Sequence, residues 1–290
     1  MGPTAQAWEA AVKRISSREP LRELAARVRS LSPPYPADLA CRLAADPRAG
    51  ARQLLELVRR RTAAYEAELE RLETMMAYER RARTDGASVV AGIDEAGRGP
   101  LAGPVVAAAV VLSDQLEALA GLNDSKLLSA KQRECLFEAI FSSGADVGWG
   151  IVSPQTIDQI GIHRAGFLAM RFAIDGLRTR PDCLLVDGFP IDGLSARCIP
   201  VVKGDRKSLS IAAASVVAKV TRDALMAAIG RHYPQYGFSQ HKGYATRAHY
   251  DAVRRHGLCP VHRKSFFESD MQQIFPFAKG SVQKRPTPAV

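Results

Sequence analysis

Three apolar, strand-like runs of this sequence end in acidic residues. Asp94 and Glu95 are adjacent and end the first run, Asp187 ends the second, and Asp205 follows the third. Ionised carboxylates beside buried apolar sequence are costly unless a cation compensates them, so these positions predict a partner such as a metal ion or an arginine. For Asp94 and Glu95 the simpler alternative is an exposed turn that carries charge. These acids are the first candidates for chemistry.

The adjacency of Asp94 and Glu95 has a geometric consequence. Successive side chains of a regular strand point to opposite faces, so a joint role of both acids predicts that the strand breaks by Glu95. Gly97 and Gly99 follow closely, and glycine accepts positive φ and lets a ligand approach the backbone. We therefore expect a strand, an acidic turn and then a second strand from Val105.

The glycines after the acidic pair do not form a familiar nucleotide-binding motif. The spacing Gly97-x-Gly99-x-x-x-Gly103 is one residue longer than the dinucleotide-binding pattern, and β-branched residues follow where that pattern needs a helix. The sequence contains no GxxxxGK[ST] motif, so a P-loop is excluded as well.

The composition indicates a folded protein with one main domain and an appendage. The chain has 290 residues, of which 47% are hydrophobic and 24% charged. It contains no apolar run of the roughly 18 residues needed to span a bilayer, and its first residues lack a signal-peptide core, so we expect a soluble, cytoplasmic protein. The five cysteines are scattered and show no CxxC spacing, which argues against a disulfide framework or a zinc cluster.

Positive charge is concentrated in one part of the chain. The net charge is +10, and residues 203–264 contain 12 Lys and Arg against three acids, together with five of the six histidines. Residues 1–85 contain 16 Lys and Arg against 12 acids, a smaller excess. The basic segment favours a surface that follows nucleic-acid phosphates, and a solvated basic surface is the alternative.

Residues 1–85 are predicted to form a separate helical extension. No Gly or Pro occurs between Ala51 and Arg83, and apolar residues there recur in steps of three and four. We expect this helix to pack on a short partner or on the main domain, with a coiled-coil dimer or a nucleic-acid contact as alternatives. The apolar positions are Trp8, Val12 and Ile15 in a first helix, Leu21, Leu24, Val28 and Leu31 in a second, and Leu55, Val58, Tyr65, Leu69, Leu72 and Met76, with Thr62 as the polar position, in the long helix.

Residues 86–270 are predicted to form an α/β domain. Two adjacent opening strands are followed by alternating strands and helices, which points to a mixed sheet covered by helices. We expect helix caps at Ser129, Ser153 and Ser208 or Ser210. Residues 271–290 are expected to be a flexible basic tail.

Several ordered motifs together resemble bacterial ribonuclease HII. The resemblance covers roughly residues 88–268 and leaves residues 1–85 outside the core pattern. The motifs, in chain order, are Gly92-Ile93-Asp94-Glu95-Ala96-Gly97-Arg98-Gly99-Pro100, Asp124-Ser125-Lys126, Val186-Asp187-Gly188, Lys203-Gly204-Asp205, Ala214-Ser215 with Lys219 and Arg222-Asp223, and His241-Lys242-Gly243-Tyr244.

The resemblance implies an RNase H-like fold and hydrolysis of RNA in RNA–DNA hybrids, including single ribonucleotides embedded in duplex DNA. It also implies that Asp94, Glu95, Asp187 and Asp205 are the catalytic, metal-binding acids. Carboxylate oxygens suit Mg²⁺ or Mn²⁺. Two such ions can activate water and stabilise the leaving 3′-oxygen, which yields a 5′-phosphate and a 3′-hydroxyl.

The resemblance further implies substrate contacts. The backbone of Gly97, Arg98 and Gly99 is expected to sense the ribose 2′-hydroxyl, with a phosphate or a neighbouring acid as the alternative partner of the Arg98 side chain. Tyr244 is expected to stack on the sugar of the following deoxynucleotide, or else to be a half-buried aromatic. The expected phosphate contacts are Lys126, Lys207 and Lys219, any of which could instead be an ordinary surface lysine.

The expected partners are RNA–DNA hybrids and DNA duplexes containing ribonucleotides, without membrane contact, and we expect a monomer. A segment from Gln272 to Phe277 is faintly similar to a sliding-clamp-binding peptide. None of the histidines is assigned to the metal site. The alternative function is a nucleic-acid-binding protein that uses the basic 203–264 segment and the helical arm without catalysis, although its acids would repel phosphate.

Overall fold

The structure is a computed structural model that describes residues 20–113, 115–191 and 193–267. The chain divides into two compact units, Met1–Thr74 and Met75–Val290. Within the described ranges no helix is long and apolar enough to cross a membrane. Trp8, Val12 and Ile15 and the segment Gln272 to Phe277, about which the sequence made predictions, lie outside those ranges.

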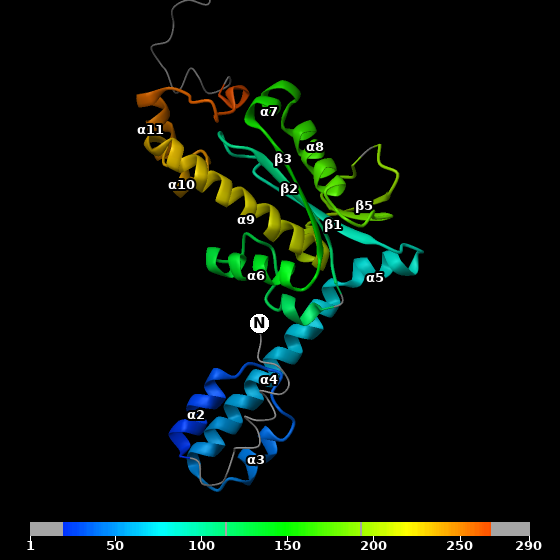
Figure 1. The fold of residues 1–290 in the computed structure, drawn as a ribbon, viewed down its shortest axis with the longest axis vertical. Coiled ribbons are helices and arrows are strands. Elements are labelled where there is room, and N and C mark those ends of the chain that lie inside the picture. Colours follow the sequence, from blue (N-terminus) through cyan, green and yellow to red (C-terminus); the bar gives the residue numbers. More distant parts are fainter. Residues whose placement is uncertain (1–19, 114, 192, 268–290) are drawn as a thin grey trace, which may run out of the picture. The chain divides into compact units, whose positions relative to one another are not determined.

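In its described part, from residue 20 on, the first unit contains helices α2, α3 and most of α4 (Figure 1). Leu24 and Val28 are buried together with Leu55 and Val58 of the long helix, which confirms that this helix packs on short partners. Further along the predicted seam, Thr62, Tyr65 and Leu69 are only partly buried. The helices are α2 (Leu21–Ser30), α3 (Leu39–Ala45) and α4 (Ala49–Met75).

The second unit contains a mixed five-stranded sheet with the strand order β3-β2-β1-β4-β5. The pairs β1–β2 and β2–β3 are antiparallel, whereas β1–β4 and β4–β5 are parallel. The mixed sheet and its antiparallel opening strands are therefore confirmed. The strands are β1 (Val90–Ala96), β2 (Val105–Val111), β3 (Asp146–Val152), β4 (Cys183–Asp187) and β5 (Arg197–Val201).

Helices cover both faces of this sheet (Figure 1). Helix α9 packs on β1 and β2 from one side, and α8 packs on β2 and β3 from the other. Serine caps begin three of the helices as predicted, at Ser129, Ser153 and Ser208. The longer helices are α5 (Ala77–Thr84), α6 (Ala130–Ser142), α7 (Pro154–Ile160), α8 (Ile162–Asp175), α9 (Leu209–His232) and α11 (Arg247–His256). The shorter ones are α10 (Phe238–His241), η1 (Leu116–Leu119), η2 (Gly204–Arg206), η3 (Pro234–Tyr236) and η4 (Lys264–Phe266).

Helix α5 belongs to the second unit, although the sequence placed it in the extension that ends at residue 85. Its Ala82 packs in a buried cluster with Val90, Leu185 and Ile211, and its Glu79 is 2% exposed. Burial of one face of α5 against the sheet and α9 explains why the compact unit begins before Gly86. The functional division into domains stays a prediction.

The prediction that strand geometry breaks by Glu95 is wrong. Strand β1 stays paired with β2 through Glu95↔Ala107 and Ala96↔Val106, and the backbone turns only at Gly97, where φ is +93°. The antiparallel ladder holds the two acids in regular strand conformation, so their side chains leave the sheet on opposite faces. The turn therefore lies one residue beyond the end of the strand.

Candidate functional site: an acidic sheet edge beside a glycine loop

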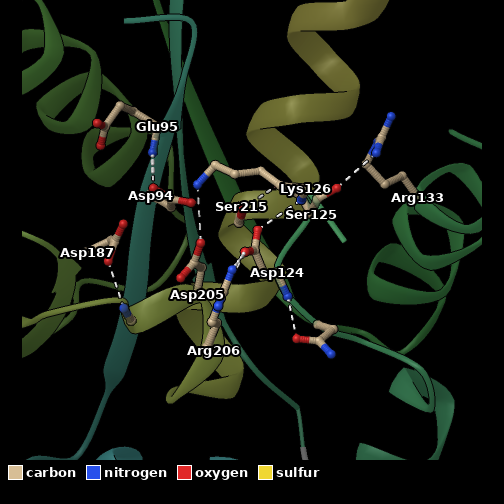
Figure 2. Close-up of polar contacts among 12 residues, drawn as sticks. Asp94, Glu95, Asp124, Ser125, Lys126, Arg133, Asp187, Asp205, Arg206 and Ser215 are labelled. Atoms are coloured by element: carbon tan, nitrogen blue, oxygen red, sulfur yellow. Dashed lines mark hydrogen bonds and ion pairs between the residues drawn. The ribbon is translucent and has the colours of Figure 1, made fainter. Parts of the chain in front are cut away.

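The four predicted acids lie near one edge of the sheet, on neighbouring strands and the turn that follows them. Asp94 and Asp187 come from the adjacent parallel strands β1 and β4, and Asp205 lies in η2, directly after β5. Figure 2 shows these acids with Lys126 reaching toward them from the loop before α6. The parallel pairing of β1 with β4 thus brings together Asp94 and Asp187, which are more than ninety positions apart in the sequence.

Alternation along the strands separates Glu95 from Asp94. Ile93 packs in the core cluster beneath α8, whereas Gly92 lies against Ser210 of α9. By this alternation Asp94 belongs to the α9 face and Glu95 to the α8 face. The Asp94 carboxylate accepts a hydrogen bond from the Glu95 N–H at 2.7 Å. Within the described ranges, no group of three or more His, Cys, Asp or Glu side chains already encloses a metal position.

Glu95 is held by an arginine of the glycine loop. Arg98 Nη1 lies 3.1 Å from Glu95 Oε1, and Arg98 Nη2 lies 2.8 Å from Nδ1 of His163 on α8. The Arg98 side chain therefore pairs with a neighbouring acid, which was the alternative expectation for it. His163 was not among the predicted site residues, and its only sequence signal was its position before the apolar face of α8.

Burial and mutual repulsion raise the pKa values of three acids. Burial, followed by the charges of Glu95 and Asp187, raises the pKa of Asp94 well above its usual value. Burial also raises the pKa of Glu95 against the opposing charge of Arg98, and burial with the charge of Asp124 raises the pKa of Asp205. Such a cluster of carboxylates is under-compensated, and added positive charge at this edge would relieve the repulsion.

Lys126 is the cation that contacts Asp205. Its Nζ lies 3.4 Å from Asp205 Oδ2, and its side chain is 74% exposed (Figure 2). Although burial acts in the other direction, the charges of Asp205, Asp124 and Asp94 raise the pKa of Lys126, so it stays protonated at neutral pH. An exposed ammonium beside a row of acids can contact a phosphate that approaches this edge.

Asp124 is a fifth acid that the sequence reasoning did not assign. It is 1% exposed, accepts from the N–H of Lys126 at 2.9 Å, and pairs with Arg206 Nη2 at 2.9 Å. These hydrogen bonds lower its pKa despite its burial. Asp124 therefore fixes the turn that carries Lys126 and anchors the η2 turn that carries Asp205. Its place directly before Ser125 and Lys126 in a recognised motif was the available signal.

A backbone hydrogen bond from Gly204 and a serine pair complete the supports of the acids. Asp187 Oδ1 accepts from the N–H of Gly204 at 2.7 Å, which joins the end of β4 to η2. Ser125 and Ser215 share a hydrogen bond of 2.7 Å (Figure 2), and hydrogen bonding by Ser215 acts on the Asp94 carboxyl to lower its pKa, against the effect of burial. Asp187 is thus supported by a backbone N–H, and Asp94 by serine side chains.

Three other side chains were predicted to contact the substrate: Tyr244, Lys219 and Lys207. Tyr244 is 43% exposed, and Lys219 Nζ lies 5.8 Å from its ring centroid while pairing with Asp223 at 2.8 Å. Tyr244 and Lys219 are thus neighbours. Lys207 is exposed at the end of η2, away from any side-chain partner in the described parts of the chain.

Comparisons with known proteins identify family models that match most of the first unit's described residues and most of the second unit. The family model described as Ribonuclease HII matches residues 91–269, and the one described as Ribonuclease HII N-terminal domain matches residues 22–83. A ribonuclease HII from Ruminiclostridium cellulolyticum is 48% identical over 217 residues, which cover 75% of this chain and 85% of that protein.

Solved structures share the fold of the second unit. The ribonuclease H2 of Pyrococcus horikoshii OT3 is 29% identical with a TM-score of 0.56, and the match covers 66% of this chain and all of that one. An Archaeoglobus fulgidus ribonuclease HII, solved in a complex with PCNA, is 26% identical with a TM-score of 0.56 over 67% of this chain and 98% of that one. The Bst ribonuclease HIII, solved in complex with Mn²⁺, has the same fold at 20% identity and a TM-score of 0.52, over 68% of this chain and 72% of that one.

Proposed function

The chain belongs to the ribonuclease HII family, and from this premise we propose a metal-dependent endoribonuclease that cuts RNA in RNA–DNA hybrids and incises duplex DNA 5′ of embedded ribonucleotides. The products would be a 5′-phosphate and a 3′-hydroxyl. Family membership supports ribonuclease H activity. The finer proposal is supported above all by one observation, the under-compensated acids at the ends of β1 and β4 and in η2, beside an exposed lysine.

We propose that Asp94, Glu95, Asp187 and Asp205 hold the divalent ions. The donor set fits, because it consists of carboxylate oxygens whose mutual repulsion a cation relieves, and such hard donors suit Mg²⁺ or Mn²⁺. When bound, such ions supply polarisation of the phosphate and of the attacking water, and stabilisation of the leaving oxygen. Glu95 leaves β1 on the other face from Asp94, and its charge nevertheless contributes to the raised pKa of Asp94.

The chain's own groups would bind and orient the substrate. Lys126 would contact a phosphate next to the scissile one, and Lys207 and Lys219 would contact phosphates further along the strand. Tyr244, exposed beside Lys219, offers a ring face to a sugar. The backbone of Gly97, Arg98 and Gly99 would contact the 2′-hydroxyl, which both donates and accepts hydrogen bonds.

The decisive experiment is incision of a DNA duplex that contains one ribonucleotide, with Mg²⁺, with Mn²⁺ and with EDTA. We expect metal-dependent cutting on the 5′ side of the ribonucleotide, and a parallel long RNA–DNA hybrid shows which substrate is preferred. Asp94→Asn should abolish cutting, whereas the matched change Asp175→Asn, at an exposed position at the end of α8, should not.

Metal-independent cutting, or full activity of Asp94→Asn, would contradict the proposed chemistry. Tight binding of hybrids without turnover under any metal condition would instead favour a non-catalytic nucleic-acid-binding protein. A contact with a sliding clamp, as in the Archaeoglobus fulgidus complex, stays a prediction for Gln272 to Phe277, which lie outside the described residues.

A further inference from the structure

The loop between β1 and β2 turns its carbonyl groups into the protein. Arg263 is 0% exposed and donates three hydrogen bonds to this loop: Nη2 to Gly97 O at 2.6 Å, Nη1 to Arg98 O at 2.9 Å and Nε to Gly103 O at 2.9 Å. The planar guanidinium has a rigid fork of donors, so it fixes the relative positions of these three peptide groups.

A second buried arginine ties the same loop to the segment that carries Tyr244. Arg222 is also 0% exposed and donates from Nε to Pro104 O at 3.0 Å and from Nη2 to Ala102 O at 3.2 Å and Lys242 O at 3.1 Å. Its guanidinium carbon lies 5.8 Å from the centroid of the Tyr244 ring. Arg222 thus links the loop and Tyr244.

The packing of Arg222 also explains why position 97 is a glycine. A Cβ atom at Gly97 would lie 2.0 Å from Nε of Arg222 and 2.9 Å from Pro104 O, and the φ of +93° is unfavourable for other residues. The close approach of the loop backbone to Arg222 therefore requires Gly97. No such contact exists at Gly99, where a Cβ would meet open space.

The inward carbonyls determine where the N–H groups of the loop point. In a planar trans peptide the C=O and N–H groups point in opposite directions. Since Gly97 O and Arg98 O face Arg263, the N–H groups of Arg98 and Gly99 face away from it. Neither N–H has an acceptor within the described parts of the chain. These two donors are available to a ligand.

Burying two cations without acidic partners is costly. Neither arginine forms an ion pair within the described residues, and Nη1 of Arg222 has no hydrogen-bond partner there. Burial and the nearby charge of Arg222 lower the pKa of Arg263 to about 9, so it remains a cation at neutral pH. Apolar residues of similar volume would fill this space at a lower desolvation cost. The two buried arginines therefore serve to position the loop more than to stabilise the fold.

We propose that Arg263 and Arg222 are positioning residues that set the selectivity for the 2′-hydroxyl, because they aim the N–H groups of Arg98 and Gly99 and hold Tyr244 at a fixed place beside them. This inference rests on the proposed function. Neither arginine touches the substrate; each acts through the backbone of the loop.

The test compares substrate selectivity in Arg263→Lys, Arg222→Lys and the matched control Arg231→Lys, an exposed position on α9. Each full-length protein is assayed on a duplex with one ribonucleotide and on the same duplex with one 2′-fluoro-2′-deoxynucleotide. We expect the ratio of kcat/KM for the two substrates to fall by about 10- to 100-fold in the two buried variants, since a displacement of about 1 Å can cost that much. Lysine keeps the charge but not the fork of donors.

A folded Arg263→Lys protein with an unchanged ratio would overturn the proposal, because a merely structural role lowers activity on both substrates equally. Failure of both variants to fold would also count against it, since the arginines would then be needed for the fold itself. The wild-type protein separates this test from the proposed function. Absence of incision by the wild type contradicts the function, whereas incision with unaltered variant selectivity contradicts only the inference.

Discussion

Glu79 is a buried carboxylate of α5 whose replacement by alanine is expected to destabilise the second unit. It is 2% exposed, and its Oε1 accepts from Ser208 Oγ at 2.6 Å, from Ser210 N at 2.9 Å and from Ser210 Oγ at 2.6 Å. These donors lie at the start of α9, directly after the η2 turn that carries Asp205. A negative charge at a helix N-terminus is favourable.

The size of the effect follows from what each donor can do without Glu79. The two hydroxyls lie 3.2 Å apart and can rearrange, whereas the Ser210 N–H would be left buried without a partner, at a cost of about 1–3 kcal/mol. Loss of the charge-assisted bonds adds to this, so we expect Glu79→Ala to lower the free energy of unfolding by about 2–4 kcal/mol. At about 2–4 °C per kcal/mol, the Tm should fall by roughly 4–16 °C.

Glu79→Gln tests the contribution of the charge. A neutral amide oxygen would have to accept three donors, and the amide nitrogen would occupy the place of Oε2, which has no hydrogen-bond partner within the described residues. We expect about half the effect of alanine. The control Glu66→Gln, at an exposed position of α4, should stay within about 0.5 kcal/mol of wild type.

Thermal and urea unfolding of the full chain, followed by circular dichroism, measures these differences. An alanine variant within about 0.5 kcal/mol of wild type, or a glutamine variant indistinguishable from the Glu66→Gln control, would refute the reasoning that Glu79 anchors the start of α9.

Four further outcomes follow from the structure. Asp94→Asn should raise the metal-free Tm at neutral pH, because folding raises the pKa of Asp94 above 3.8 and the ionised acid therefore destabilises the folded chain above about pH 4. The same change should reduce the Tm increase that Mg²⁺ produces and lower kcat/KM by on the order of a thousandfold. A metal-free Tm equal to that of the wild type would contradict this. His249 and His262 have pKa values lowered to about 4, chiefly by burial, so their contribution to stability should be complete above pH 6.5 and be lost as the pH falls toward 4. The free energy of unfolding from urea titrations should therefore depend less steeply on pH in His249→Gln than in the wild type, and an equal pH dependence would contradict this. Tyr244→Ala should raise KM for the ribonucleotide duplex by about 5- to 100-fold, as expected for loss of a stacked ring, while Tm stays near wild type, since Tyr244 is 43% exposed. A chain that begins at Gly86 lacks Glu79 and should unfold at a lower urea concentration than one that begins at Met75; equal midpoints would show that α5 adds no stability.

Local sequence signals predicted the main elements of the fold. The serine caps at Ser129, Ser153 and Ser208, the apolar runs of the strands and the periodic face around Leu24 and Val28 all depend on neighbours a few residues away. Such interactions are encoded in short windows, which is why they can be predicted without coordinates.

The break expected by Glu95 shows where that reasoning fails. The sequence showed two adjacent acids before glycines, but the ladder with β2 holds both in strand conformation and places them on opposite faces. Hydrogen bonds to a strand that pairs along its whole length outweigh the local freedom of the glycines that follow.

The sequence alone predicted that the acids lie at the ends of strands, and the order of the motifs predicted the family to which the chain belongs. Only the tertiary structure decided what surrounds them. Arg263 reaches back more than 150 positions to the loop at Gly97, and Glu79 reaches forward more than 130 positions to Ser210. A buried arginine or glutamate has the same appearance in a sequence as a surface one, because its partners are backbone groups that only the folded chain brings within hydrogen-bonding distance.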